Sequence, residues 1–545
     1  MNEGRSVRAT AGPLEAERSS TSAWVPGPDR IVVGKDVLEL LSSSMYVDPM
    51  TIFREYIQNS ADSIDEARVS EAITSKAPGN VAIQLDAASR LVRIRDNGMG
   101  LPWERFVERI CNLGASAKRG TAARGFRGVG RLSGLGYCQE LTFRSRSLEE
   151  GLISELRWDC RRLKAALRSP EVKLDISDLV RDVVTVRRIS ADNYPNHFFE
   201  VELKGVIRHR DDRLLNPQAV AGYLSQVAPV PFAPDFRYGG DITAALGAHV
   251  PLGDLDIRIN GSDCPIYRPY QNRIDLGGGE HDRYTDLEFH EIPGVEGGVA
   301  AVAWILHHGY SGAIPNKALV KGLRLRTGNM QVGDHTLLEE LFPEPRFNAW
   351  SVGEIHVVDN RVIPNGRRDH FEQNVHLDNI VNHLGSVAKD IARRCRQSSI
   401  ERKWLREFEL HRDGAIERAK MVARGGLSKA GRKAQTEGAA KSLATMQKIA
   451  NQRHLADETR ATLHSQATAT AARVAKLLEG EPKAADPLAR FRPQERTVYE
   501  RMIGLIYECA GSRVAARALV DKILIKLGDG TEEKSRPSRK KRRRR

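Results

Sequence analysis

Three groups of residues in the first third of the chain have the types and spacing needed for phosphate chemistry. In the first, Glu55, Asn59 and Asp62 stand at positions i, i+4 and i+7 of a segment with helical periodicity. Side chains at this spacing lie along one stripe of a helix. An amide oxygen is a hard ligand of the kind that Mg²⁺ prefers, and a carboxylate can orient or deprotonate an attacking water. Taken alone, the spacing also fits a solvated polar face.

The second group is the run Asp96-Asn97-Gly98-Met99-Gly100, which directly follows a predicted strand. Its glycines allow the backbone to approach a ligand closely. A carboxylate only accepts hydrogen bonds, so Asp96 is suited to an exocyclic amine such as that of adenine. The competing interpretation is an ordinary turn, because Asp, Asn and Gly are common turn residues.

The third group is the glycine-rich segment GFRGVG at 125–130. Backbone N–H groups in such a loop can hold phosphate oxygens, particularly where a helix follows. The preceding segment 112–120, NLGASAKRG, is small, basic and suited to a lid over phosphates. No G-K-[ST] follows, which excludes a P-loop, and no strand leads directly into the glycines, which argues against a dinucleotide fingerprint.

The elements that must position these groups are predicted from periodicity. Helices are expected at 37–46 and 51–70, and a hairpin is expected from VAIQLD, a turn at AASR and LVRIRD. Further strands are expected at ELTFRSRS, FFEVELKG, LDIRING, VAAVAWILHH and EIHVVDNRV. From 391 to 480 the composition shifts to Ala, Arg, Lys, Gln and Glu, which is typical of long helices.

The charge of the chain is divided unevenly. Residues 391–545 hold 37 Lys and Arg against 18 Asp and Glu, a net charge of +19, whereas residues 1–390 carry −5. The basic part could meet nucleic acid or another acidic partner, or could be a solvated helical surface. Six scattered cysteines without a CxxC pair argue against a structural zinc site or a disulfide framework, and no apolar run is long enough for a membrane span. A cytoplasmic protein is the default expectation.

In this order and spacing, FREYIQNSADSIDEAR, IRDNGMG, NLGASAKRG and GFRGVG resemble the GHKL ATPase superfamily, and most closely the heat-shock protein 90 (HtpG) type of ATPase and chaperone. The resemblance implies that Glu55 is the catalytic base, with Arg54 beside it, and that Asn59 binds Mg²⁺ and phosphate. It implies that Asp96 reads adenine. The other positions that it places around ATP are Asp62, Gly98, Met99, Gly100, Asn112, Lys118, Gly125, Gly128, Val129 and Gly130. Thr185 is a weak candidate for a further adenine contact.

The resemblance extends thinly into GEIHVVDNRVIPNGRRDHFEQN at 353–374. There it implies that an arginine three residues after Asn365, which is Arg368, reaches the γ-phosphate, with Arg367 as the second choice. Other branches of the superfamily use a lysine, for which Lys321 and Lys317 are candidates. A cation supplied by a second domain would couple domain closure to hydrolysis.

The resemblance implies an α/β fold with a Bergerat-type ATP-binding α/β sandwich, a βαβ middle (transducer) domain and an all-α C-terminal region. We expect a disordered leader at 1–27, the ATP-binding domain at 28–215 and the middle domain at 216–390. A long helical region at 391–480, a linker at 481–488, a small helical domain at 489–528 and a basic disordered tail at 529–545 should follow.

Two functions share this pocket. The first is an ATP-hydrolysing conformational clamp, a homodimer acting on client proteins. The alternative is a Microrchidia-like or MutL-like clamp acting on DNA through the basic C-terminal region. A histidine kinase is excluded because no histidine lies in the roughly 30 residues before the pocket, and a scaffold without ATPase activity is disfavoured because Glu55 is present.

Overall fold

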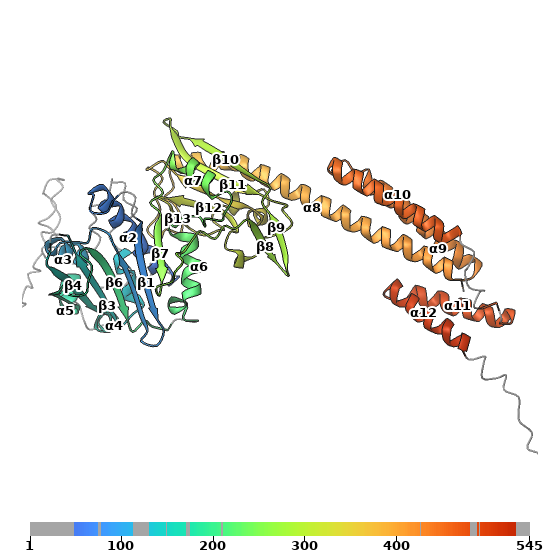
Figure 1. The fold of residues 1–545 in the computed structure, drawn as a ribbon, viewed down its shortest axis with the longest axis horizontal. Coiled ribbons are helices and arrows are strands. Elements are labelled where there is room, and N and C mark those ends of the chain that lie inside the picture. Colours follow the sequence, from blue (N-terminus) through green and yellow to red (C-terminus); the bar gives the residue numbers. More distant parts are fainter. Residues whose placement is uncertain are drawn as a thin grey trace, which may run out of the picture.

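The computed structural model describes residues 48–74, 78–112, 130–148, 150–169, 175–208, 211–425, 427–479, 488–489 and 491–529. The predicted leader and the helix expected at 37–46 lie outside these residues. Two α/β bodies lie side by side, and a helical arm extends from the second (Figure 1). No helix of the described part is both long enough and apolar enough to cross a membrane.

The first body is built on one seven-stranded sheet in the order β5-β4-β3-β6-β2-β1-β7. Neighbouring strands are antiparallel except β1 and β7, which are parallel. The strands are β1 (Gly79–Asp86), β2 (Leu91–Asp96), β3 (Glu140–Arg146), β4 (Leu152–Asp159), β5 (Val184–Ser190), β6 (Phe198–Lys204) and β7 (Leu255–Ile259). The helices are α2 (Thr51–Val69), α3 (Trp103–Cys111), α4 (Cys160–Arg168), α5 (Ile176–Val183) and α6 (Pro217–Val227), with 3-10 helices η3 (Gly130–Gly136) and η4 (Arg213–Leu215).

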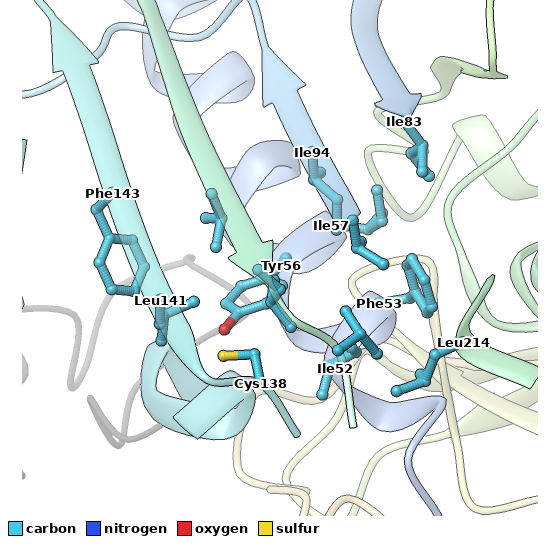
Figure 2. Close-up of a cluster of buried hydrophobic side chains, with 14 of the residues drawn as sticks. Ile52, Phe53, Tyr56, Ile57, Ile83, Ile94, Cys138, Leu141, Phe143 and Leu214 are labelled. Carbon is cyan, nitrogen blue, oxygen red and sulfur yellow. The ribbon is translucent and has the colours of Figure 1, made fainter. Parts of the chain in front are cut away.

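Strand alternation gives this sheet one apolar and one charged face. In β2, Val92 and Ile94 belong to the same core as Phe53 and Ile57 of α2. Figure 2 labels Ile94, Phe53 and Ile57 in this core. The alternate residues Arg93 and Arg95 form ion pairs with glutamates of β6 on the opposite face. The predicted hairpin, with its alternation, is therefore confirmed.

The strand LDIRI, which the sequence prediction places in the middle domain, instead completes the first sheet. Strand β7 pairs in parallel with β1, from Gly79 opposite Leu255 to Ile83 opposite Ile259. Val220 and Leu224 of α6 also belong to the first core. The boundary expected at 215/216 thus falls within one body. Parallel strands need a long crossover connection, so β7 can pair with β1 although it comes much later in the chain.

The second body has a mixed five-stranded sheet in the order β10-β11-β14-β12-β13. Its parallel pair, β12 with β14, is joined through β13 and two 3-10 helices, and not through the α-helix of the expected βαβ unit. The elements are α7 (Gly239–Gly247), β8 (Arg273–Gly277), β9 (Glu280–Arg283), β10 (Asp286–Pro293), β11 (Val299–His307), η5 (Asn316–Ala318), β12 (Gly322–Thr327), β13 (Met330–Val332), η6 (Glu339–Leu341), η7 (Pro345–Trp350) and β14 (Val352–Val357).

One 50-residue helix, α8 (Val375–Arg424), joins the second body to the arm (Figure 1). Its first half packs on the second sheet through Leu377, Ile380 and Leu384. Its second half carries Phe408, which packs with α9 and α10. The boundary expected at 390/391 therefore cuts one continuous helix. The arm consists of α9 (Lys429–Ala450), α10 (Asp457–Glu479), α11 (Pro493–Cys509) and α12 (Arg513–Asp529).

Candidate functional site

Helix α2 carries the first group of predicted site residues. It begins after Asp48-Pro49, where the Asp48 carboxylate accepts the backbone N–H of Met50 at 3.0 Å. Glu55 is only 6% exposed and Arg54 7% exposed, whereas Asn59, one turn further on, is half-buried. Within the described atoms, Glu55 Oε1 has no hydrogen-bond donor. Burial of an unsatisfied carboxylate oxygen is costly, so this atom is a natural place for a ligand or water.

The predicted Asp96 motif lies directly against the same helix. Asp96 ends β2, accepts the N–H of Gly98 at 2.9 Å and is also hydrogen-bonded by Ser60 of α2. A Cβ on Gly98 would stand 2.3 Å from the Ser63 hydroxyl, so glycine is required for this approach. The N–H of Met99 donates to the carbonyl of Ser63 at 3.3 Å. Helix and loop, separated by a hairpin in the sequence, thus form one wall.

Burial gives Asp96 unusual acid–base properties. Its side chain is 4% exposed, and this desolvation raises the pKa of the carboxyl to about 7, although three hydrogen bonds oppose the rise. A carboxyl in this range binds a proton in competition with a ligand that donates to it near neutral pH. Gly100 adopts a left-handed φ of 65°, and a Cβ there would lie 2.0 Å from the Arg146 carbonyl.

Gly130 brings the end of the glycine-rich segment to Glu55. A Cβ at this position would lie 2.1 Å from Glu55 Oε2. Tyr56 holds the following turn, η3, because its hydroxyl donates to the carbonyl of Arg131 at 3.3 Å and accepts the N–H of Gly134 at 3.0 Å. The remaining predicted members of this segment lie outside the described residues: Lys118, Gly125, Gly128 and Val129.

Asn112 lies at the other end of that segment, at the C-terminus of α3, and is exposed. Its backbone carbonyl accepts a hydrogen bond from the Arg131 guanidinium. Burial of this guanidinium lowers the pKa of Arg131 to about 10. Arg131 therefore links the start of η3 to the C-terminal end of α3.

A loop of the second body reaches the first body at Glu55. Arg368 Nε lies 3.5 Å from Glu55 Oε1, and both side chains are about one-tenth exposed. Arg54 donates to the backbone carbonyls of Arg368 at 3.3 Å and Arg367 at 3.0 Å. Arg368 has a left-handed φ of 56°, in a tight turn closed by the bridge between Pro364 and Phe371. The sequence reasoning did not foresee that Arg54 would anchor this loop.

The other candidate cations have different contacts. The Arg367 side chain is exposed. Lys317 pairs with Asp275 of β8 at 3.0 Å, and Lys321 donates to Asn316 at 3.0 Å. Of the four candidates, the structure brings Arg368 to Glu55.

Thr185, the weak adenine candidate, is exposed on β5, the edge strand of the sheet opposite β7, so the structure does not bring it to Asp96. Ser60 and Ser63 were not singled out, although both contact the Asp96 motif. Their position could have indicated this contact, because both serines follow Asn59 on α2, the helix that faces the Asp96 loop. Asp62 is buried, at 8% exposure, on the same helix.

Asn59 is the predicted magnesium ligand. No group of three or more His, Cys, Asp or Glu able to hold a metal occurs in the part of the chain that the structure describes. Asn59, half-buried one turn from Glu55, fits a single oxygen ligand whose other partners are phosphates and waters.

Comparison with known proteins gives partial matches. No family model matches this chain. The chaperone protein HtpG of Chlorobium luteolum is 33% identical over 127 residues, which are 22% of this chain and 18% of the relative. HtpG of Legionella pneumophila is 34% identical over 92 residues, and that of Coxiella burnetii 37% over 94 residues; each match covers 16% of this chain and 14% of the relative. The chain matches less than a fifth of the length of these relatives. It therefore contains a region similar to the HtpG chaperones, within an α/β architecture.

Proposed function

We propose that this protein binds ATP with Mg²⁺ and hydrolyses it to ADP and phosphate. The observation that carries the proposal is the ion pair between a buried carboxylate oxygen of Glu55 and Arg368 of the other body, whose Nε lies 3.5 Å away. A base and a cation on separate bodies are what a hydrolytic site needs if closure is to control turnover. The partial similarity to chaperone protein HtpG supports the same assignment.

Each residue then has a defined task. The Asp96 carboxylate accepts a hydrogen bond from the amino group of adenine. Gly98 and Gly100 let the loop lie close to the adenine ring. Asn59 would hold Mg²⁺ through its side-chain oxygen, and the ion would supply positive charge at the phosphates. Glu55 Oε1 orients and deprotonates the attacking water. Arg368 stabilises the charge that develops on the transferred phosphoryl group.

The cycle that we propose is that of a conformational clamp. The segment between Asn112 and Gly130 closes over ATP, two copies meet through their first bodies, and the second body supplies Arg368. Client proteins bind the second body or the arm of this cytoplasmic homodimer. The two bonds from Arg54 to the Arg367 and Arg368 carbonyls would hold the loop in place during turnover.

The affinity for ATP should depend on pH through Asp96. The nucleotide needs the ionised carboxylate, whose pKa is raised to about 7, so a proton competes with ATP below that value. We expect the affinity to fall about tenfold between pH 8 and pH 6, in calorimetry at saturating Mg²⁺. Asp96→Asn should bind weakly and without this dependence, whereas Asp178→Asn, at an exposed position, should behave like the wild type. A pH-independent wild-type affinity would contradict this role.

Replacing Arg368 should impair turnover more than binding. Arg368→Ala removes the cation beside Glu55, and we expect the hydrolysis rate to fall at least about tenfold, with a dissociation constant for ATP close to that of the wild type. Arg367→Ala is the matched control, because its side chain is exposed and Arg54 binds only its carbonyl. Equal loss of turnover in both variants would show that the loop, and not the Arg368 side chain, matters.

The charge division of the chain favours a second candidate, an ATP-driven clamp on DNA. Residues 391–545 carry a net charge of +19, and the sequence ends in seven basic residues, RKKRRRR. DNA binding through them should weaken steeply as salt is raised, and removal of residues 529–545 should reduce the slope of log K against log salt by several units. Fluorescence anisotropy with a duplex measures both. Salt-insensitive or absent binding in both proteins would exclude this candidate.

A further inference from the structure

The second body contains a cavity of about 690 Å³ that the nucleotide site does not use. It lies between the segments 233–238 and 267–273 and the end of β9 at Arg283 and Tyr284. None of its lining residues belongs to the group around Glu55 and Asp96. Its volume is within the range of pockets that hold small-molecule ligands.

The walls of the cavity are aromatic, with Tyr238, Tyr267, Tyr270 and Tyr284 among the lining residues. The hydroxyl of Tyr270 is occupied, since it donates to Glu354 at 3.1 Å. Tyr238 differs, because its side chain is 93% buried, with 7% exposed, and its hydroxyl has no hydrogen-bond partner among the described atoms. Its hydroxyl is enclosed by protein atoms, so the half-buried ring of Tyr267 is the aromatic surface that the cavity offers to a ligand.

The rim of the cavity is basic. Arg273 and Arg283 stand directly opposite each other across the β8–β9 hairpin. Their two positive charges repel each other at this spacing. Both are exposed, and neither guanidinium forms an ion pair with any residue that the structure describes. Arg237 lies over the ring of Tyr238, 4.7 Å from its centroid. Asp235 is the one carboxylate in the lining. An anion bound at this rim would relieve the repulsion.

We propose that this cavity binds a nucleoside monophosphate unit, either free or as one residue of a single-stranded nucleic acid. A planar base would stack on Tyr267, and the phosphate would lie between Arg273 and Arg283, whose guanidinium groups suit phosphate oxygens. An apolar ligand would leave the two facing arginines without a counter-charge.

The test uses the full-length protein and three probes: uridine monophosphate, a fluorescein-labelled ten-residue oligouridylate and inorganic phosphate. Calorimetry or anisotropy compares wild type with Arg273→Ala/Arg283→Ala. We expect a loss of affinity of at least about tenfold, as removal of charged hydrogen bonds requires. The charge-matched control is Arg162→Ala/Arg181→Ala, at positions 60% and 78% exposed on the first body. Arg237→Ala serves as a second variant if the hairpin variant is unfolded by circular dichroism.

Each outcome is informative. Binding of both uridylate probes, lost in the pocket variant and kept in the control, supports a site for free nucleotides. Binding of the oligouridylate alone, with the same loss, supports a single-strand site. No binding, equal binding by the pocket variant, or phosphate binding as tight as that of uridine monophosphate overturns the proposal. Asp96→Asn should leave uridylate binding unchanged, so failure of the ATP site would not affect this result.

Discussion

Replacing Glu55 by Gln should abolish ATP turnover while preserving ATP binding. The substitution keeps the volume of a side chain packed against Gly130 but removes the base that orients water. General-base catalysis contributes about 10²–10⁴-fold, so a loss of at least about a hundredfold in kcat is expected. A coupled assay of phosphate release measures turnover, and calorimetry measures binding.

The matched control is Glu66→Gln, an exposed glutamate on the same helix, α2. Its turnover should equal that of the wild type, because its side chain is exposed to solvent. Wild-type turnover in Glu55→Gln would remove the assigned role of the base. Loss of ATP binding in that variant would assign Glu55 to binding, and the proposed division of tasks would be wrong.

Replacing Glu354 by Gln should strongly destabilise the second body. Glu354 is fully buried in β14, where Arg268 and Arg326 both pair with it and Tyr270 donates to it at 3.1 Å. Loss of its charge would leave two buried arginines without a carboxylate. Breaking a buried ion pair in this way costs about 3–5 kcal/mol, which urea unfolding would register as a lower midpoint.

This cluster also joins the two bodies. Arg326 donates to the backbone carbonyls of Gln226 and Ala228, at the end of α6, which packs in the first core. The substitution should therefore lower the stability of both bodies, and most strongly that of the second. Glu340→Gln, an exposed glutamate of the same body, should change the unfolding free energy by less than about 0.5 kcal/mol. Similar midpoints for the two variants would contradict the role of the cluster.

The direction in which the stability of the fold changes with pH follows from the pKa of Glu354. The arginines hold this pKa well below its ordinary value although burial opposes them. The ion pairs therefore stabilise the fold fully at pH values above the ordinary glutamate pKa, and their contribution is lost as acid titrates the carboxylate through its lowered pKa. The difference in stability between wild type and Glu354→Gln should shrink in strong acid.

The local elements and the chemical groups that they carry could be predicted from the amino-acid pattern alone. Helical spacing placed Glu55 and Asn59 on one helix, and strict alternation in β2 predicted a half-buried strand that ends at Asp96. Local periodicity and turn residues decide such features within ten to twenty residues, so they can be read without the fold. The identity of Arg368 as a candidate likewise came from a motif.

Which groups from distant parts of the chain come into contact depends on the folding of the whole molecule. Strand β7 joins the first sheet, Arg54 binds the carbonyls of Arg367 and Arg368, and Glu354 collects arginines from separate segments. The fall of the pKa of Glu354 and the rise of that of Asp96 to about 7 depend on burial and partners far away in the chain. Packing between residues far apart in the chain sets these pKa values, and no local sequence pattern indicates which residues will pack together. For the same reason, the domain boundaries at 215/216 and 390/391 could not be located from composition.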